Sequence, residues 1–317
     1  MSKNTLTSST SSFPFHSYGE WLSERFPFPV QKLSVDGGFT CPNRDGHLSR
    51  TGCTYCNNES FVPAYCREAK AVSQQLEAGK QFFRRKHPQM RFMAYFQSYS
   101  NTYGQLSELQ RCYEEALSVD GVVGIVISTR PDCLSEEVLA YLEQLSRHTC
   151  VVLEIGVESL RDDILRSIHR GHDVACSIDA IHRAATRHGL TVGIHLIIGL
   201  PNTCLEEHID QLSVVNALPI TLLKLHQLQV VCNTPLAQQY AERPFPLLTP
   251  EEYLPFVADY LEHLRPDIVV ERLLSQAPPQ MVVAPRWNLK NHEFVDRLVG
   301  HMRTRGMHQG RRWRERE

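Results

Sequence analysis

The 317-residue sequence predicts an α/β fold built on a parallel sheet. Six apolar, β-branched segments recur along the chain, and they alternate with amphipathic helical patterns. Their near-continuous apolar character suits parallel strands that are covered on both faces. No G-x-G-x-x-G follows the first segment, which counts against a dinucleotide-binding Rossmann fold. Periodicity alone does not distinguish an open sheet from a partial barrel.

The expected strands cover residues 30–35, 91–99, 122–130, 151–159, 190–200 and 220–231. The helical patterns between them cover residues 71–86, 105–119, 135–147, 175–189 and 204–216. Ser135 stands ahead of Glu136 and Glu137, a pattern typical of a helix N-cap. Beyond residue 232 the pattern changes: we expect a helix over 250–264 and a strand over 267–274, followed by a segment without regular secondary structure. We therefore place a small C-terminal extension with a basic tail over residues 233–317.

The two ends of the chain and its composition narrow the class of protein. Residues 1–29 begin with a polar, Ser/Thr-rich stretch that lacks the apolar segment of a signal peptide, so we expect a mostly disordered leader. No run of about 18 apolar residues indicates a membrane span, and we expect no membrane partner. The formal net charge of −2 excludes a global basic field. We expect a cytoplasmic protein, in which clustered thiols hold metal rather than form disulfides.

Three of the ten cysteines, Cys41, Cys53 and Cys56, lie in one loop directly after the first expected strand. The carboxyl ends of strands are where α/β folds gather their ligands. Thiolates bind zinc or iron–sulfur clusters. A structural zinc needs a fourth ligand, which Cys66 or His47 could supply, whereas three thiolates on a four-iron cluster leave one iron open for a substrate or cofactor. The other cysteines occur singly and indicate buried, unreactive thiols.

Several longer motifs carry a family resemblance. An aromatic residue before the last cysteine, here Tyr55 in "CTYC", is typical of radical S-adenosylmethionine (SAM) enzymes. The segments "ISTRPD", "LEIGVESLRDDILRSIHRGHD", "HLIIGLP" and "LKLHQLQVVCNTPL" resemble the radical SAM domain of the Elongator catalytic subunit. With "VDGGFTCPNRDG" and "AYFQSYSNTY", residues 30–290 most closely resemble YhcC-like radical SAM proteins.

The resemblance implies a partial (β/α)6 TIM-like barrel of the radical SAM type, with residues 30–232 as the radical SAM core and the C-terminal extension covering substrate at its open side. It implies that Cys41, Cys53 and Cys56 ligate a [4Fe-4S] cluster whose fourth iron is chelated by SAM. An electron from the cluster then cleaves SAM to methionine and a 5′-deoxyadenosyl radical, which abstracts hydrogen from substrate. A flavodoxin or ferredoxin-like electron donor is the implied partner.

The SAM contacts that the resemblance implies begin at the ends of the second and third strands. Gln97 and Ser98 are expected near the methionine amino group. Thr129 and Arg130 follow, and the Arg130 guanidinium suits the SAM carboxylate. The alternative for Arg130 is a surface ion pair at a strand end.

Further contacts are expected from the next strands. Glu158 stands where relatives carry Gln for the ribose hydroxyls, and Arg170 is a second candidate for the carboxylate or ribose. His195 is expected to point toward adenosine, the alternative being a core histidine with its own partners. Glu154 has the same facing as Glu158, since side chains alternate along a strand, and is expected behind it.

Two departures qualify the resemblance. Eleven residues separate Cys41 from Cys53, more than in the commonest radical SAM motif, and Ser128 stands where Elongator-like sequences have Glu. Too few residues follow the sixth expected strand for the Elongator acetyltransferase domain, so acetyl-CoA chemistry is not expected.

The resemblance makes tRNA, modified at its wobble uridine, one candidate substrate. Basic clusters with aromatic residues at 80–87 and 301–317 fit a nucleic-acid surface, or else a solvated helix face and a loose terminus. The alternatives are a radical SAM enzyme acting on a small-molecule metabolite, a zinc-stabilised nucleic-acid-binding module, and an iron–sulfur electron carrier that does not use SAM.

Overall fold

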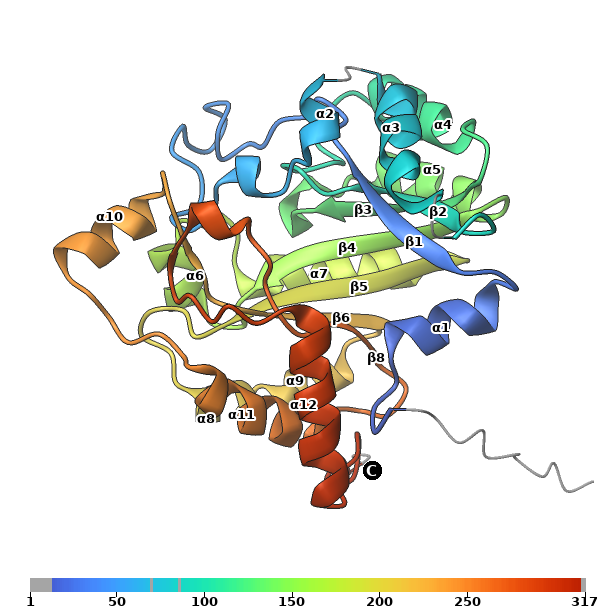
Figure 1. The fold of residues 1–317 in the computed structure, drawn as a ribbon. Coiled ribbons are helices and arrows are strands. Elements are labelled where there is room, and N and C mark those ends of the chain that lie inside the picture. Colours follow the sequence, from blue (N-terminus) through green and yellow to red (C-terminus); the bar gives the residue numbers. More distant parts are fainter. Residues whose placement is uncertain (1–12, 69–70, 85–86, 315–317) are drawn as a thin grey trace, which may run out of the picture.

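A computed structural model describes residues 13–68, 71–84 and 87–314. Its main sheet has seven strands, all parallel, in the order β1-β2-β3-β4-β5-β6-β8 (Figure 1). The strands are β1 (Val30–Val35), β2 (Arg91–Phe96), β3 (Val122–Thr129), β4 (Cys150–Glu158), β5 (Leu190–Ile198), β6 (Leu222–Gln227) and β8 (Val269–Arg272). The predicted parallel α/β sheet, curved into a partial barrel, is confirmed. The segment expected as one strand over 220–231 ends at Gln227, and β7 (Val230–Val231) instead pairs antiparallel with β9 (Val282–Ala284).

Helices connect the strands in chain order. They are α1 (Tyr18–Arg25), α2 (Ala64–Glu68), α3 (Val72–Arg84), α4 (Leu106–Leu117), α5 (Glu136–Ser146), α6 (Asp162–Ser167), α7 (Val174–Ala185), α8 (Leu205–Asp210), α9 (Leu212–Ala217), α10 (Pro235–Glu242), α11 (Pro250–His263) and α12 (Asn291–Thr304). The Ser135 side chain accepts a hydrogen bond from Val138 N at 3.2 Å, so the predicted N-cap of α5 is confirmed. The helix expected over 204–216 is divided at Gln211 into α8 and α9. None of the described helices is both long and apolar enough to cross a membrane.

The convex face of the sheet carries the main hydrophobic core. Alternate strand residues, among them Phe92, Ile125, Leu153, Ile194 and Leu223, are at most 1% exposed. Helices α3, α4, α5 and α7 contact strands β1, β3, β4 and β5. Burying each large apolar side chain contributes about 1.5–3 kcal/mol, so this face supplies most of the stability of the barrel.

The concave face is filled at the amino ends of the strands by α1, which lies beside β1 and β8 (Figure 1). Trp21 of α1 is 1% exposed and packs in one cluster with Met93, Val126, Val152 and Val269 from the strands. The leader expected to be mostly disordered over residues 1–29 is therefore ordered from residue 13, because a buried indole anchors it, while residues 1–12 lie outside the described residues. This apolar floor leaves the concave face open toward the carboxyl ends of the strands.

The segment predicted as a C-terminal extension takes part in the barrel. Its strand β8 pairs parallel with β6, so the sheet continues beyond residue 232. Gln309 near the chain end is buried, accepts a hydrogen bond from His16 N at 2.8 Å and donates to Ile268 O at 2.8 Å. The division of the chain at residue 232 thus remains a prediction. The sheet itself contains strands from both sides of that division.

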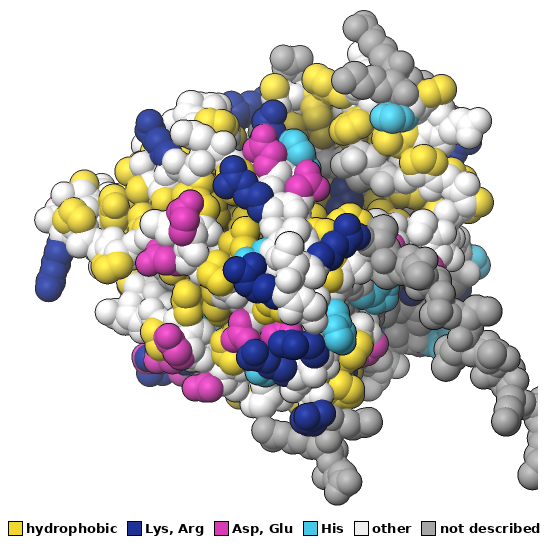
Figure 2. Space-filling view, turned by 60° about the horizontal axis from the view of Figure 1, so that its bottom comes forward, with side chains coloured by type: hydrophobic (Ala, Val, Ile, Leu, Met, Phe, Trp, Pro, Cys, Tyr) yellow, Lys and Arg dark blue, Asp and Glu magenta, His cyan; other side chains and the backbone are white. Residues whose placement is uncertain are grey.

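The basic tail is held by acidic side chains of α11. Arg311 and Arg312 form ion pairs with the fully buried Glu262, and Arg312 also pairs with Asp259 at 2.9 Å. On the face shown in Figure 2, basic and acidic side chains lie next to one another rather than forming a continuous basic field. The charges of Arg311 and Arg312 are therefore compensated within the molecule.

Candidate functional site

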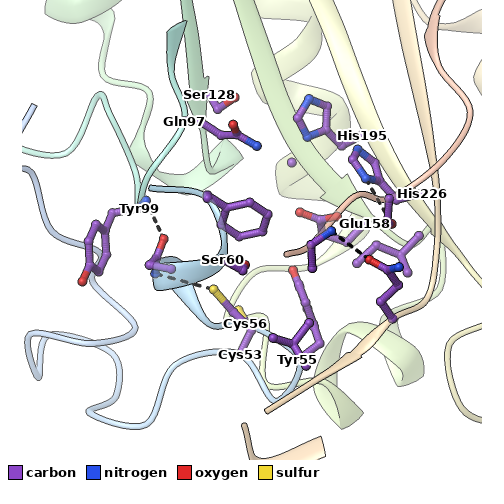
Figure 3. A pocket seen from close by; sticks show the side chains of 18 of the residues that line it. Cys53, Tyr55, Cys56, Ser60, Gln97, Tyr99, Ser128, Glu158, His195 and His226 are labelled. Carbon is purple, nitrogen blue, oxygen red and sulfur yellow. Dashed lines mark hydrogen bonds between the residues drawn. The ribbon is translucent and has the colours of Figure 1, made fainter. Parts of the chain in front are cut away.

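A cavity of about 380 Å³ lies at the carboxyl ends of the strands. The ends of parallel strands meet at one edge of the sheet, so side chains far apart in sequence converge there. Figure 3 shows Cys53, Cys56 and Tyr55 on one side of the cavity, with His195 and His226 on another. The cavity is lined by the three clustered cysteines and by six of the predicted SAM-binding side chains: Cys41, Cys53, Cys56, Gln97, Thr129, Arg130, Glu158, Arg170 and His195.

The cysteine loop is folded by its own backbone hydrogen bonds. Arg44 N donates to Cys41 O at 2.7 Å, and Cys56 N donates to Cys53 O at 3.1 Å. Gly52 has φ +77°, and a Cβ there would meet the Arg44 guanidinium at 2.9 Å. The Gly, Pro and Asn residues of the loop therefore allow a compact turn that presents all three thiols to the same cavity.

Hydrogen-bond donors point at two of the three sulfurs. Cys53 Sγ accepts from Asn43 Nδ2 at 3.4 Å and from Arg170 Nη1 at 3.6 Å, and Cys56 Sγ accepts from Asn58 Nδ2 at 3.6 Å. Burial, with the neighbouring Cys53, raises the pKa of the Cys56 thiol to about 11. The free thiol is therefore protonated at neutral pH and releases its proton when metal binds. Donors around sulfur stabilise thiolate ligands of an iron–sulfur cluster, which fits this donor set.

The zinc alternative lacks its fourth ligand. Cys66 Sγ donates to Ser34 O at 3.3 Å and does not line the cavity, and His47 is exposed. Over the described ranges, no three His, Cys, Asp or Glu side chains are placed to hold a single metal ion. Three thiols that share a cavity without closing on one ion fit a larger group such as a four-iron cluster.

Two buried arginines bring unpaired donors to the cavity. Arg130 is 2% exposed, with Nε and Nη2 bonded to Asp132 at 2.9 and 2.8 Å, while its Nη1 has no partner among the described residues. Arg170 Nη2 donates to Gly156 O at 2.7 Å and lies 3.4 Å from Glu158, while its Nε is also unpartnered there. The alternative of an ion pair at the strand end is also seen, since Arg130 pairs with the exposed Asp132, but the Arg130 guanidinium itself is buried and lines the cavity. Unsatisfied buried donors fit an anionic ligand group.

The remaining predicted SAM contacts, Gln97, Thr129 and Ser98, differ in whether they reach the cavity with a free polar group. Gln97 lines the cavity, with Oε1 3.4 Å from Ser34 Oγ. Thr129 lines it too, but its hydroxyl is bonded to Ser100 and Thr102 at 3.0 and 2.6 Å. Ser98 is buried and is not among the lining residues, so the structure does not bring it together with the others.

The end of β4 has an irregular backbone that shapes the site. Glu158 has φ +67°, and the pairing of β4 with β5 shifts register between Gly156 and Glu158. A Cβ on Gly156 would lie 2.6 Å from Arg170 Nη2 and 2.7 Å from Glu158 Oε1. The glycine therefore allows the arginine and the carboxylate to meet beside the cysteines, and the strain at Glu158 directs its side chain into the cavity.

Glu154 lines the cavity, where it accepts hydrogen bonds from side chains of several strands. Its carboxylate is 1% exposed and accepts from Lys32, Lys224, Tyr95, Ser128 and His195 at 2.8, 2.6, 2.8, 2.9 and 3.0 Å. Burial alone would raise its pKa, but Lys224 and Lys32 hold the pKa of Glu154 well below its usual value. Glu154 was expected behind Glu158, but both side chains line the cavity. His195 lines the cavity, as expected for a contact to adenosine, and its Nε2 also bonds to Glu154 at 3.0 Å, as expected for a histidine with its own partner. Both interpretations therefore describe part of its environment.

Sequence reasoning missed most of the charged layer around Glu154. Lys224 pairs with Glu271 at 2.9 Å, Lys32 pairs with the same carboxylate, and burial lowers the pKa of Lys224 to about 8. The available signal was a lysine inside "VQKLSV" and another inside "LLKLHQ", since a charge within a strand covered on both faces requires a buried partner.

Comparison with known proteins identifies the family. The model of the radical SAM superfamily matches residues 41–212, and that of the Radical_SAM C-terminal domain matches residues 220–304. YtqA of Bacillus subtilis (strain 168) is 30% identical over 311 residues, covering 98% of this chain and 96% of that protein. YhcC of Escherichia coli (strain K12) is 32% identical over 300 residues, covering 93% and 96%. Elongator complex protein 3 of Homo sapiens is 30% identical over 169 residues, which is 52% of this chain and 30% of that protein.

Solved structures share the fold at low identity. The archaeal Methanocaldococcus infernus Elp3 superposes with a TM-score of 0.66 at 17% identity, covering 89% of this chain and 64% of that one. Streptococcus suis SuiB bound to S-adenosylmethionine gives a TM-score of 0.51 at 11% identity, covering 78% and 51%. These likenesses confirm the partial barrel. The chain belongs to the radical SAM superfamily, and as an enzyme of that superfamily it uses a [4Fe-4S] cluster and SAM.

Proposed function

We propose that this chain cleaves SAM reductively and uses the product to abstract hydrogen from an organic substrate. One observation carries the proposal: three thiols of a single loop line the same cavity as two buried guanidinium groups with unpaired donors. When bound, the reduced cluster supplies the electron that converts SAM to methionine and a 5′-deoxyadenosyl radical. A flavodoxin or ferredoxin-like donor is the proposed source of that electron.

The residues of this chain would bind and orient the two cofactors. Cys41, Cys53 and Cys56 are the proposed cluster ligands, and the Arg130 guanidinium is the proposed partner of the SAM carboxylate, with Arg170 as the second candidate. The Gln97 amide side chain is proposed for the amino group, because it lines the cavity directly after β2 and its oxygen can accept from an ammonium group.

The adenosine end of SAM would lie toward β4 and β5. The Glu158 carboxylate is proposed to accept from the ribose hydroxyls, and His195 is proposed to contact adenosine from β5. Ser98 and Thr129 remain in the proposed set as residues that shape the strand ends, since the Thr129 hydroxyl is bonded to Ser100 and Thr102 and Ser98 is buried outside the cavity lining.

The test is anaerobic reconstitution with iron and sulfide, followed by SAM and dithionite and mass spectrometry for 5′-deoxyadenosine. Cys56→Ala is expected to lose the cluster and the product. Cys204→Ala is the matched control, because Cys204 is exposed at the start of α8 and outside the cavity lining. An intact four-iron cluster that binds SAM but yields no 5′-deoxyadenosine, with dithionite and the candidate substrates present, would refute the proposal. Bound zinc in place of iron would support the alternative of a zinc-stabilised nucleic-acid-binding module.

We propose tRNA, at a wobble uridine, as the first substrate to test. Support comes from the half-chain similarity to Elongator complex protein 3 and from two rings, Phe61 and Tyr99, that line the cavity while 39% and 38% exposed. Exposed rings at a cavity suit stacking with a base taken out of its own stack. A Phe61→Ala/Tyr99→Ala variant should weaken tRNA binding, and Phe82→Ala, on the 71% exposed ring of α3, is the control.

The basic segments give tRNA less support than their sequence implied. Lys80 is 1% exposed and pairs with Glu77 at 2.7 Å, and Arg311 and Arg312 pair with acidic residues of α11. Residues 85–86 and 315–317 of these clusters lie outside the described residues. If tRNA binds, its affinity should fall steeply with salt. Affinity that is unchanged between low and high salt would favour a small-molecule metabolite instead.

A further inference from the structure

The wall of the cavity across from the cysteines is built by β6, β8 and the segment after β8. Ser275 N donates to Gln227 Oε1 at 2.6 Å, Ser275 Oγ donates to Gln227 O at 2.7 Å, and Ala277 N donates to Gln229 Oε1 at 3.1 Å. These bonds fix residues 275–277 against residues 227–229, and all six residues line the cavity. The wall is therefore preorganised rather than a loose covering.

One cation of this wall has no compensating anion. Of the arginines that line the cavity, Arg130 pairs with Asp132 and Arg170 pairs with Glu158, and Arg44 on the cysteine loop donates to Cys56 O. The side chain of Arg272, at the end of β8, makes no ion pair or hydrogen bond with any described residue. The layer beneath contains one buried carboxylate oxygen without a hydrogen-bond partner, Glu271 Oε2, but it carries no excess negative charge.

That layer is already balanced in charge. Lys32 and Lys224 each pair with both Glu154 and Glu271, so two ammonium groups meet two carboxylates. The positive charge of Arg272 is thus left for the contents of the cavity.

A second polar group beside Arg272 also has no partner. His226 lines the same wall, and its Nε2 is buried without a hydrogen bond among the described residues, while its Nδ1 lies 3.4 Å from Ser275 Oγ. Burial, followed by the charges of His195, Arg272 and Lys224, holds the pKa of His226 well below its usual value, so its imidazole is neutral at pH 7. A buried polar nitrogen without a partner fits a ligand atom.

We infer that Arg272 and His226 form a subsite for an anionic group, a carboxylate or a phosphate, on the molecule that this enzyme turns over. The inference rests on the proposed function, since it assigns the wall facing the cysteines to the substrate. A guanidinium offers two parallel donors that match a carboxylate or phosphate. The subsite is separate from the Arg130 and Arg170 donors proposed for SAM, so SAM and the anion should bind together.

The test measures anion binding without turnover. Cluster-loaded protein saturated with SAM, and without reductant, is titrated by calorimetry with inorganic phosphate and separately with acetate. Arg272→Gln should weaken the binding of the preferred anion at least tenfold, and Arg272→Lys should weaken it less because the charge remains. Arg166→Gln is the control, since Arg166 is exposed on α6 and outside the cavity. Tighter binding of phosphate than of acetate indicates a phosphorylated substrate, and tighter binding of acetate indicates a substrate with a carboxylate.

Three outcomes would overturn the subsite: no saturable anion binding to the wild type, equal affinity in Arg272→Gln, or displacement of SAM by the anion. Loss of SAM affinity in Arg272→Gln, measured by equilibrium dialysis, would likewise assign this arginine to the cofactor. Thermal melting of each variant identifies one that has failed to fold. Anion binding without SAM cleavage would refute the proposed function alone, and SAM cleavage without anion binding would refute the subsite alone.

Discussion

Replacing Glu154 by Gln tests whether the buried charged layer holds the barrel together. The substitution keeps the shape of the side chain and removes its charge. Two buried ammonium groups, Lys32 and Lys224, then share the single carboxylate of Glu271. A buried charge without its partner is costly, so we expect a large loss in the free energy of unfolding.

The contact distances set the size of the loss. At the 2.6 and 2.8 Å separations from Glu154 to Lys224 and Lys32, each pair gains about 6 kcal/mol at an effective dielectric constant of about 20. Desolvation of the charges offsets much of this, and removing one partner of such a pair costs about 3–5 kcal/mol. Because burial already lowers the pKa of Lys224 to about 8, this lysine can release its proton in the variant. We therefore expect the lower end, about 3 kcal/mol.

Urea unfolding of the cluster-free protein at neutral pH, followed by circular dichroism, measures the change. Glu136→Gln is the matched control, since Glu136 also pairs with two arginines, Arg183 and Arg187, but its side chain is 60% exposed. Surface pairs contribute less than about 1 kcal/mol. A Glu154→Gln variant as stable as this control would refute the reasoning, as would a Glu154→Gln/Lys224→Met double variant less stable than the single one.

Three further predictions follow from named contacts. Gly156→Ala should displace Arg170 and lower the iron content and the SAM affinity, because the added Cβ would lie 2.6 Å from Arg170 Nη2. Gly300→Ala is the control and should bind iron normally, since a Cβ there would have no atom within 4 Å. Burial lowers the pKa of His208 to about 4, so the folded state binds fewer protons than the unfolded state and stability falls as pH drops from about 6.5 toward 4. His208→Phe should remove about 2 kcal/mol of that fall, measured by urea unfolding at pH 7 and 4.5, and an unchanged slope would contradict it. Trp21→Ala should cost about 3–5 kcal/mol in urea unfolding, and a loss under about 1 kcal/mol would show that α1 is not a structural floor.

Local sequence determined most of the strands and helices. The strand expected over residues 30–35 begins and ends as predicted, and the helix expected over 135–147 begins after its Ser135 cap. Each of these rests on neighbouring residues: an apolar run for a strand and a capped amphipathic pattern for a helix. The grouping of Cys41, Cys53 and Cys56 was also local, since one short loop carries all three.

Only the tertiary structure decided which distant charges meet. Lys32, Glu154, Lys224 and Glu271 come from four strands spread over most of the chain. Nothing in the spacing of these lysines and glutamates, which are separated by 47 to 239 residues, indicates that they pair. The same holds for α1, whose Trp21 is buried because the barrel provides an apolar floor, and for Arg272, which reaches the cavity because β8 pairs with β6. Periodicity reports which face a residue occupies, whereas strand order decides which residues share that face.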